Sequence, residues 1–520
     1  MESVSLTTTQ MLRKDLRELD KKRWLVRYAI LAAVGSVLAI KIYLVLFVID
    51  FVIGLYSIVT TGVLFTVLFI SYAKFRDPFL QLLKSRGNGG HDPLDGQKNK
   101  LSVSIIVPVK NEEGNIRNCV ESALHSSYPN KEVIVVNDGS TDNTGVILDQ
   151  VHKEWEHSKT GGLKVIHLSK NVGKKKAIEA AVQVANGDIL VFTDSDCNID
   201  EDAIQVTVEL FESNREIGAL TAHGRVRNAD NGNTLEKIQH VWYDGQYRII
   251  KGMESSFSSL TCCSGAFSAF RRIAVQPFMH RWANDKFLGT DFKFCTDRLL
   301  TSYLLRSPVN MPAQSNEAAQ SLQSTTSISS PVHAISDENT NSDSVFATGK
   351  DDLDAMRSVQ SLDKEELALG NKHTHLWKVV YSPSIKVSIG PPTTFKQLIK
   401  QQIRWRKSFI RSIFATGGIY WKRPLAAAIL YYLQLGLKII RPYIIFHALF
   451  LLPLLGDYYS GALYVSSVLF SGMIYGIDYR LRHPGDGKWL YRPLMTLMST
   501  FIFSWLIIYS ALTIRKMAWR

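Results

Sequence analysis

Two kinds of hydrophobic pattern divide the chain. Long apolar runs occupy residues 24–73 and 425–513, whereas charged and apolar residues are mixed over residues 101–300, as in a soluble α/β domain. Phe51–Ala73 contains no charged residue and is long enough to cross a bilayer as a helix. Trp24–Phe47 is also apolar, apart from Arg27 and Lys41. We therefore expect two membrane helices within residues 24–74, after an amino-terminal segment of residues 1–23.

The carboxy-terminal region, residues 425–514, predicts about three further spans: Leu425–Leu455, Gly461–Gly476 and Leu494–Ile514. The first is overlong and carries Lys438, Arg441 and Pro442, so it is either a kinked span or an interfacial helix followed by a shorter span. This count places the residues after 514 on the opposite side of the membrane from the middle of the chain. Arg515 and Lys516 on that side would be an exception, because Lys and Arg beside membrane spans are usually enriched on the cytoplasmic side.

The net charge of +13 is concentrated beside the apolar runs. Basic residues precede the first run and follow the second: Arg13, Lys14, Arg17, Lys21, Lys22, Arg23, Arg27, Lys74 and Arg76. This pattern indicates anionic lipid headgroups rather than nucleic acid as the partner. It predicts a multi-pass protein of the plasma membrane whose amino terminus and middle domain are cytoplasmic. The five cysteines form no CxxC pair, in keeping with reduced thiols in that compartment.

Residues 100–306 have the pattern of an α/β domain. Apolar strands are expected at Val103–Val109, Glu132–Val136, Val165–Leu168 and Ile189–Thr193, with helices between them. This alternation predicts a mainly parallel sheet with flanking helices, whose polar loops meet at the carboxyl ends of the strands.

Residues 307–371 predict a disordered insertion. They are rich in Ser, Thr and Asn, with few aromatic residues, and cannot bury enough apolar surface to offset the entropy of ordering. We expect a short helix around Asp351–Leu369. For this insertion, a surface loop that the fold tolerates is favoured over a loop with a regulatory role. Residues 372–424 then complete the domain and supply interfacial helices.

Polar residues at the predicted strand ends are candidates for a binding site. Asp194 and Asp196 end the fourth strand, and their spacing suits a Mg²⁺ or Mn²⁺ ion that also contacts substrate phosphates. Asp138 either accepts a hydrogen bond from a base or ribose, or caps a helix. Lys174 opens an alanine-rich helix, where it either approaches a diphosphate or belongs to a solvated basic turn.

Two helical stretches carry further candidates. Asp297 stands near the start of an amphipathic helix, where it is either a general base or a surface group paired with Arg298. Gln401, Arg404 and Trp405 share one helix, in which Arg can clamp phosphate and Trp can stack on a sugar. Trp405 and Arg404 would also suit a helix at the lipid headgroups.

The order of five motifs resembles glycosyltransferase family 2, in particular the processive membrane synthases of hyaluronan, chitin and cellulose. The motifs are SIIVPVKNEE, VIVVNDGSTDNT, VFTDSDCNID, TDRLLTS and QQIRW, and the resemblance covers about residues 100–306 and 372–412. It implies a GT-A type domain and a UDP-sugar donor. The base motif reads TDR rather than EDR or DDR. No WGT-type segment follows the QxxRW helix, and the short carboxy-terminal membrane region is closer to rhizobial chitooligosaccharide synthases.

The resemblance also implies roles for individual residues. Asp297 would be the catalytic base, and Asp194 and Asp196 would hold the metal. The donor would contact Pro108, Glu112, Asp138, Lys174 and Arg404, and the acceptor would contact Gly265, Gln401 and Trp405.

The implied function is inverting transfer from a UDP-sugar to a growing β-linked glycan that passes between the spans. UDP-GlcNAc, alone or alternating with UDP-GlcA, and UDP-Glc are the donors to consider, and a hyaluronan- or chitin-type synthase is favoured. A single-sugar transferase acting on a polyprenyl phosphate is the alternative, but such enzymes usually lack QxxRW. A non-catalytic membrane scaffold is disfavoured because all four aspartates of the site are present.

Overall fold

The computed structural model describes residues 28–29, 31–44, 46, 50–87, 101–155, 162–309 and 376–516. The amino-terminal segment 1–23 lies outside the described residues. So does the predicted insertion from residue 310 onward, together with its expected short helix.

One eight-stranded sheet forms the centre of the middle domain, with strand order β3-β2-β1-β4-β7-β6-β10-β5. The four strands predicted from sequence are its parallel half: β1 (Val103–Val109), β2 (Lys131–Asn137), β3 (Gly162–His167) and β4 (Ile189–Phe192). Every residue of β1 and β4 is buried, which explains why both strands are apolar apart from Ser104.

The other half of the sheet is mixed. Strand β7 (Ser268–Arg271) runs antiparallel to both β4 and β6 (Ile217–Val226). Strand β10 (Lys378–Ile389) is parallel to β6, and β5 (Cys197–Ile199) is antiparallel to β10. The result is a mixed sheet of the GT-A type, in which residues beyond 375 complete a sheet begun before residue 307. Strands β8 (Lys286–Phe287) and β9 (Thr290–Asp291) form a separate hairpin.

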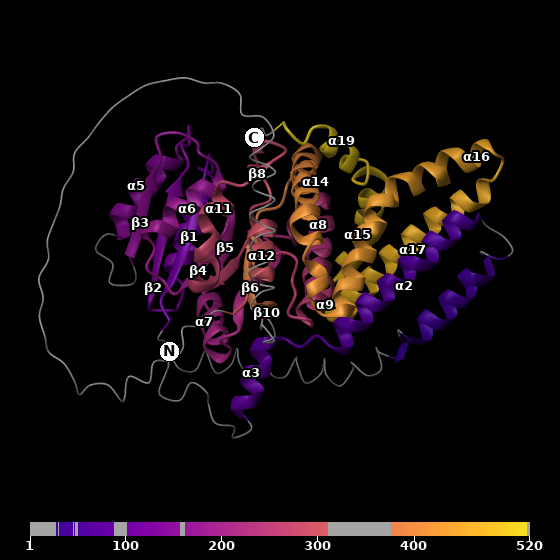
Figure 1. The fold of residues 1–520 in the computed structure, drawn as a ribbon, viewed down its shortest axis with the longest axis horizontal. Coiled ribbons are helices and arrows are strands. Elements are labelled where there is room, and N and C mark those ends of the chain that lie inside the picture. Colours follow the sequence, from indigo (N-terminus) through magenta and orange to yellow (C-terminus); the bar gives the residue numbers. More distant parts are fainter. Residues whose placement is uncertain are drawn as a thin grey trace, which may run out of the picture. The chain divides into compact units, whose positions relative to one another are not determined.

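Helices flank these strands (Figure 1). The early ones are α4 (Ile116–Leu124), α5 (Thr144–Trp155), α6 (Lys174–Val184) and α7 (Ala203–Ser213). The later ones are α8 (Thr234–Gly245), η1 (Gln246–Lys251), α9 (Gly252–Ser255), α10 (Arg272–Val275), η2 (Gln276–Phe278), α11 (Met279–Ala283), α12 (Thr296–Arg306), α14 (Phe395–Gly417) and η3 (Tyr420–Lys422). Apolar residues of β1, β2, β4, α4 and α7 share one buried core.

Three helical segments are long and apolar enough to cross a membrane. They contain α2 (Phe51–Ala73), which continues into α3 (Pro78–Gly87); α15 (Leu425–Phe446) with η4 (His447–Leu451) and α16 (Leu452–Leu454); and α17 (Tyr458–Arg482). Helices α15 and α17 both pack against α2 (Figure 1).

The first and last predicted spans differ from these three. In the stretch predicted at 24–47, the described residues include an apolar helix over Leu31–Leu44, and several of the flanking residues lie outside the described part of the chain. The last predicted span is broken, because Gly487–Ile502 and Leu506–Leu512 meet at an angle of 43°. This broken segment comprises η5 (Gly487–Tyr491), α18 (Arg492–Leu497), η6 (Met498–Ile502) and α19 (Leu506–Leu512). Counting it as one span gives four among the described residues.

Candidate active site

The structure brings all the candidate site residues to a single cavity of about 730 Å³. It starts at the carboxyl ends of β1, β2 and β4 and continues between the membrane helices. The candidates that line it are Pro108, Glu112, Asp138, Lys174, Asp194, Asp196, Gly265, Asp297, Gln401, Arg404 and Trp405. Residues from Pro108 to Trp405 therefore share one site.

Asp194 and Asp196 form a compact group with Cys197 just beyond β4. One possible ligand atom from each of the three lies within 4.8 Å of the others. Burial and repulsion from Asp194 raise the pKa of Asp196 to about 6. A divalent cation would relieve that repulsion, and the two carboxylates are the hard oxygen ligands that Mg²⁺ and Mn²⁺ prefer. Burial raises the pKa of the Cys197 thiol well above its ordinary value, so this group stays protonated and is a poor ligand for such ions.

Lys174 is the first residue of α6 and forms an ion pair with Asp194. Burial alone would lower the pKa of Lys174, but the fields of Asp194 and Asp297 outweigh burial and raise it. The ammonium group therefore stays charged in the middle of the carboxylates. Lys174 is not part of a solvated turn, because its side chain is only 16% exposed.

Asp138 holds the loop that leads into α6. Its two carboxylate oxygens accept hydrogen bonds from the backbone N–H groups of Val172 (2.7 Å) and Gly173 (3.0 Å). The neighbouring Gly139 has φ of 61°, and a Cβ there would lie 2.7 Å from the Asn171 nitrogen. Asp138 thus binds the backbone directly before α6, as the helix-cap interpretation expects. Its contact with a base or ribose stays a prediction.

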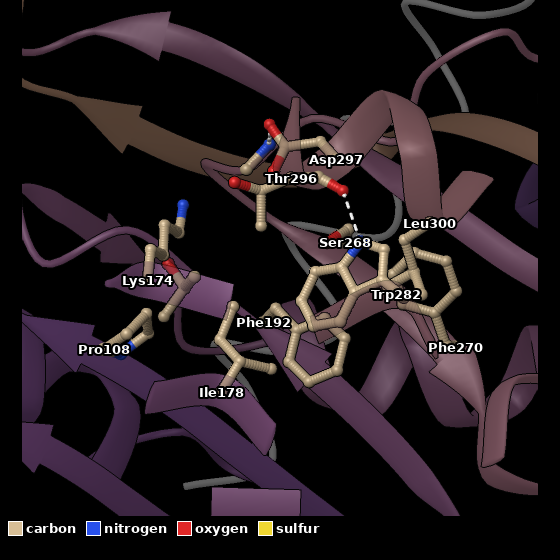
Figure 2. Close-up of a pocket in the computed structure, with 12 residues that line it drawn as sticks. Pro108, Lys174, Ile178, Phe192, Ser268, Phe270, Trp282, Thr296, Asp297 and Leu300 are labelled. Atoms are coloured by element: carbon tan, nitrogen blue, oxygen red, sulfur yellow. Dashed lines mark hydrogen bonds between the residues drawn. The ribbon is translucent and has the colours of Figure 1, made fainter. Parts of the chain in front are cut away.

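Asp297 lies in the first turn of α12 and faces the cavity rather than solvent. Its Oδ2 accepts a hydrogen bond from the backbone N–H of Gly265 at 3.0 Å. Burial raises its pKa, Lys174 opposes that rise, and Asp194 adds to it. Figure 2 shows Lys174 and Asp297 at the rim of a small pocket floored by Trp282. The Trp282 Nε1–H donates to the Thr296 carbonyl at 3.0 Å and so fixes the start of α12.

Trp405 belongs to an aromatic cluster between α14 and α8. Its ring is stacked against Trp242 at a centroid distance of 5.8 Å, and Tyr243 meets it edge-on at 6.3 Å. Trp405 remains 37% exposed, which leaves part of the ring available to a ligand. Sequence reasoning missed Trp242, Tyr243 and Trp282, because none of these residues belongs to a recognised motif.

Sequence reasoning also missed a buried ion triad behind α6. Asp285 accepts from Arg411 of α14 at 2.6 Å and pairs with Lys175 of α6 at 3.2 Å. The side chains of Asp285 and Lys175 are each 4% exposed. The triad ties the helix that presents Lys174 to the helix that presents Arg404.

Residues 104–277 match the sequence model described as Glycosyl transferase family 2. This segment is a glycosyltransferase family 2 domain. The chain is 31% identical over 208 residues to the poly-β-1,6-N-acetyl-D-glucosamine synthase of Staphylococcus epidermidis, a match covering 40% of this chain and 46% of that protein. It is 23% identical over 434 residues to the hyaluronan synthase of Streptococcus pyogenes, covering 82% of this chain and 85% of that protein. The chain spans less than half the length of the Staphylococcus relative.

A solved structure with similarity across most of the chain is the mannosyltransferase PcManGT from Pyrobaculum calidifontis in complex with GDP-Man and Mn²⁺. It shows 15% identity and a TM-score of 0.46 over 87% of this chain and 98% of that one.

Proposed function

We propose that the chain is a membrane-integrated, inverting glycosyltransferase that adds sugars from UDP-GlcNAc to a growing β-linked glycan. The observation that supports this most strongly is the shared cavity. Asp297, Lys174 and the Asp194–Asp196 pair lie at one end of it, and the membrane helices α2, α15 and α17, together with α18 and η6, contribute much of the remaining wall. A product made at Asp297 would stand at the start of a path between those helices.

Asp297 would act as the general base. As a carboxylate it takes the proton of the acceptor hydroxyl while that oxygen attacks the anomeric carbon of the donor. The bond from this carbon to the diphosphate oxygen breaks, and UDP leaves from the opposite face, so the configuration inverts. Lys174 and Arg404 would bind the negative charge that develops on the diphosphate.

A bound Mg²⁺ or Mn²⁺ would be held by Asp194 and Asp196 and would neutralise the leaving diphosphate. The Gly265 N–H, bonded to Asp297, orients the carboxylate toward the acceptor. Trp405, with its exposed ring face, would stack on a sugar of the acceptor.

N-acetylglucosamine is favoured as the transferred sugar because the Staphylococcus relative is named for a polymer of it. The basic residues beside the spans favour a cytoplasmic catalytic domain at the plasma membrane. Repeated transfer with export is favoured because the cavity is continuous from the catalytic residues to the membrane helices.

The deciding experiment compares wild type with Asp297→Asn in UDP release from UDP-GlcNAc and Mn²⁺ by the purified full chain. Loss of the base should slow transfer by about 10²- to 10⁴-fold, while UDP binding is nearly unchanged. Asp196→Ala should instead weaken metal-dependent donor binding. Asp149→Asn, at a side chain that is 62% exposed and remote from the cavity, is the matched control.

Unchanged transfer by Asp297→Asn would remove this residue as the base. A product that extracts into organic solvent as a single sugar on a polyprenyl phosphate would overturn polymer synthesis. Product sizing on a gel decides between the two kinds of product.

A further inference from the structure

The main chain of Asp196 is held by two residues that are distant from it in sequence. Its carbonyl oxygen accepts a hydrogen bond from the Arg227 Nη2 at 2.6 Å and another from the Gly390 N–H at 3.3 Å. Arg227 directly follows β6, and Gly390 directly follows β10. Because the Asp196 carboxylate is a proposed metal ligand, the ends of these two strands set where that ligand can stand.

The guanidinium of Arg227 also contacts two asparagine side chains. Its Nη2 donates to the Asn198 Oδ1 of β5 at 3.1 Å, and its Nη1 donates to the Asn115 Oδ1, directly before α4, at 3.4 Å. The Asn115 Nδ2 in turn donates to the Glu112 Oε2 at 3.1 Å. Glu112 lines the cavity and is a predicted donor contact. One arginine therefore joins the loop that carries Asp196 to the loop that carries Glu112.

The acceptors that Arg227 uses are uncharged. It forms no ion pair with any residue that the structure describes, although it contacts the residue that carries the Asp196 carboxylate. A guanidinium commonly binds a carboxylate through two parallel hydrogen bonds. Here it binds the backbone carbonyl and two amide oxygens instead. It therefore fixes the backbone of Asp196 and does not occupy the carboxylate.

Arg227 is itself anchored where β6 and β10 end side by side. Its N–H donates to the Ile389 carbonyl at 2.9 Å, and Val226 is paired with Ile389 in the parallel register. The side chain of Arg227 is half-buried and is not among those that line the cavity. Arg227 can therefore act on a ligand only through the residues that it holds in place.

The carboxylates of Asp194 and Asp196 repel each other when no cation lies between them. The free-energy cost of bringing them together is smaller if the backbone already holds them in position. We propose that Arg227 is a positioning residue, which fixes the Asp196 backbone for binding of the divalent cation that accompanies the donor diphosphate. This inference rests on the proposed function and adds to it a residue outside the five motifs.

Binding of Mn²⁺ to the purified full chain in the presence of UDP tests this role without turnover. Free Mn²⁺ is measured from its electron paramagnetic resonance signal. Arg227→Gln should weaken Mn²⁺ binding by about 10- to 100-fold, the usual effect of losing a residue that orients a metal ligand. Arg227→Lys keeps a charged donor and should recover part of that affinity.

Arg225→Gln is the matched control. Arg225 lies on β6 two residues before Arg227, its side chain is 44% exposed, and it pairs with Asp200 at 2.8 Å. An exposed pair of this kind contributes little free energy. Arg225→Gln should therefore bind Mn²⁺ as wild type does.

UDP release from UDP-GlcNAc is the kinetic arm. For Arg227→Gln, the Mn²⁺ concentration that gives the half-maximal rate should rise by the same factor as the Mn²⁺ dissociation constant. The kcat at saturating Mn²⁺ and donor should stay close to the wild-type value, because Arg227 does not touch the reacting atoms. Mn²⁺ with UDP should also raise the thermal unfolding midpoint less in Arg227→Gln than in wild type, since this rise measures binding to the folded state.

The outcomes separate a positioning role from a structural one. A lower unfolding midpoint with unchanged Mn²⁺ affinity would show a structural role only and would overturn the inference. A lower kcat at saturating Mn²⁺, with an unchanged Mn²⁺ requirement, would overturn it as well. Should Arg227→Gln fail to fold, Arg227→Lys decides by itself, because its Mn²⁺ affinity should still lie below that of wild type. Absence of UDP release by wild type with every donor overturns the proposed function, while Mn²⁺ binding still decides the role of Arg227.

Discussion

At the scale of single residues, the geometry around Asp297 leaves no room for an additional atom. A Cβ at Gly265 would lie 2.8 Å from Asp297 Oδ2 and 3.0 Å from Asp194 Oδ2. Both carboxylates belong to the proposed chemistry, so the methyl group would displace the groups whose positions matter most.

Gly265→Ala should therefore reduce kcat by about 10²-fold, because a shift of roughly 1 Å at reacting groups costs that much. The rate of UDP release at saturating donor measures it. Gly114→Ala, at a glycine with open space around its Cβ position, should keep wild-type kcat. A normal kcat for Gly265→Ala would show that the Asp297 carboxylate need not stay where it is.

His223 predicts a pH dependence of stability. Burial lowers its pKa to about 3, an effect that Asp244 opposes at an Oδ1–Nε2 distance of 3.8 Å. The unfolded chain titrates this group near its ordinary value of about 6.5. As the pH falls below that value, the unfolded state binds a proton that the folded state does not, so stability decreases until the pH reaches the folded pKa.

The loss should be at most about 1.4 kcal/mol per pH unit between pH 6 and 4. Thermal unfolding midpoints of wild type and His223→Gln across that range measure it, and the variant should show a shallower decline. His280→Gln, at a side chain that is 89% exposed, should follow wild type. Parallel pH profiles for wild type and His223→Gln would contradict the assignment.

At the scale of elements, α6 and α14 are held together by the buried Lys175–Asp285–Arg411 triad. Removing the shared acid leaves two cations without a partner in a region that excludes water. Such a change typically costs about 3–5 kcal/mol, more than a surface pair contributes.

Asp285→Asn should thus lower the free energy of unfolding by several kcal/mol, and with it the thermal midpoint of the full chain in detergent. Asp291→Asn is the matched comparison, because Asp291 is 61% exposed and pairs with Lys176 at 3.9 Å. It should change stability by less than about 1 kcal/mol. Equal thermal unfolding midpoints for Asp285→Asn and Asp291→Asn would contradict this prediction, because they would mean that water solvates the charges of the triad.

At the scale of the whole molecule, the broken last segment turns back toward the catalytic domain. The Ser510 hydroxyl donates to the Ile403 carbonyl at 3.4 Å, and the Lys407 Nζ donates to the Lys516 carbonyl at 2.6 Å. Helix α19 therefore packs along α14, the helix that carries Gln401, Arg404 and Trp405. The Lys516 carbonyl therefore lies beside α14 of the catalytic domain.

We predict that residue 515 lies on the same side of the membrane as the catalytic domain, whereas the span count from sequence predicted the opposite side. Labelling of Arg515→Cys by a membrane-impermeant maleimide in sealed inside-out vesicles measures this. Tyr459→Cys, in a residue that is 69% exposed at the far end of α17, should react in right-side-out vesicles instead. Labelling of both variants in right-side-out vesicles would contradict this prediction and would support the opposite side, as the span count from sequence predicted.

The sequence by itself predicted the four strands of the parallel half of the sheet and the membrane helices that contain α2, α15 and α17, and it indicated the types of chemistry. The buried stretches Val133–Val136 and Ile189–Phe192 are apolar throughout, and Asp138 and Asp194 follow them within two residues, so local pattern was enough to find both. Tertiary structure decided what depends on neighbours distant in sequence. The order of β7, β6, β10 and β5, the Asp285 triad and the aromatic partners of Trp405 each depend on contacts between separate elements. Such contacts leave no local periodicity, because burial and charge compensation are properties of the assembled surroundings.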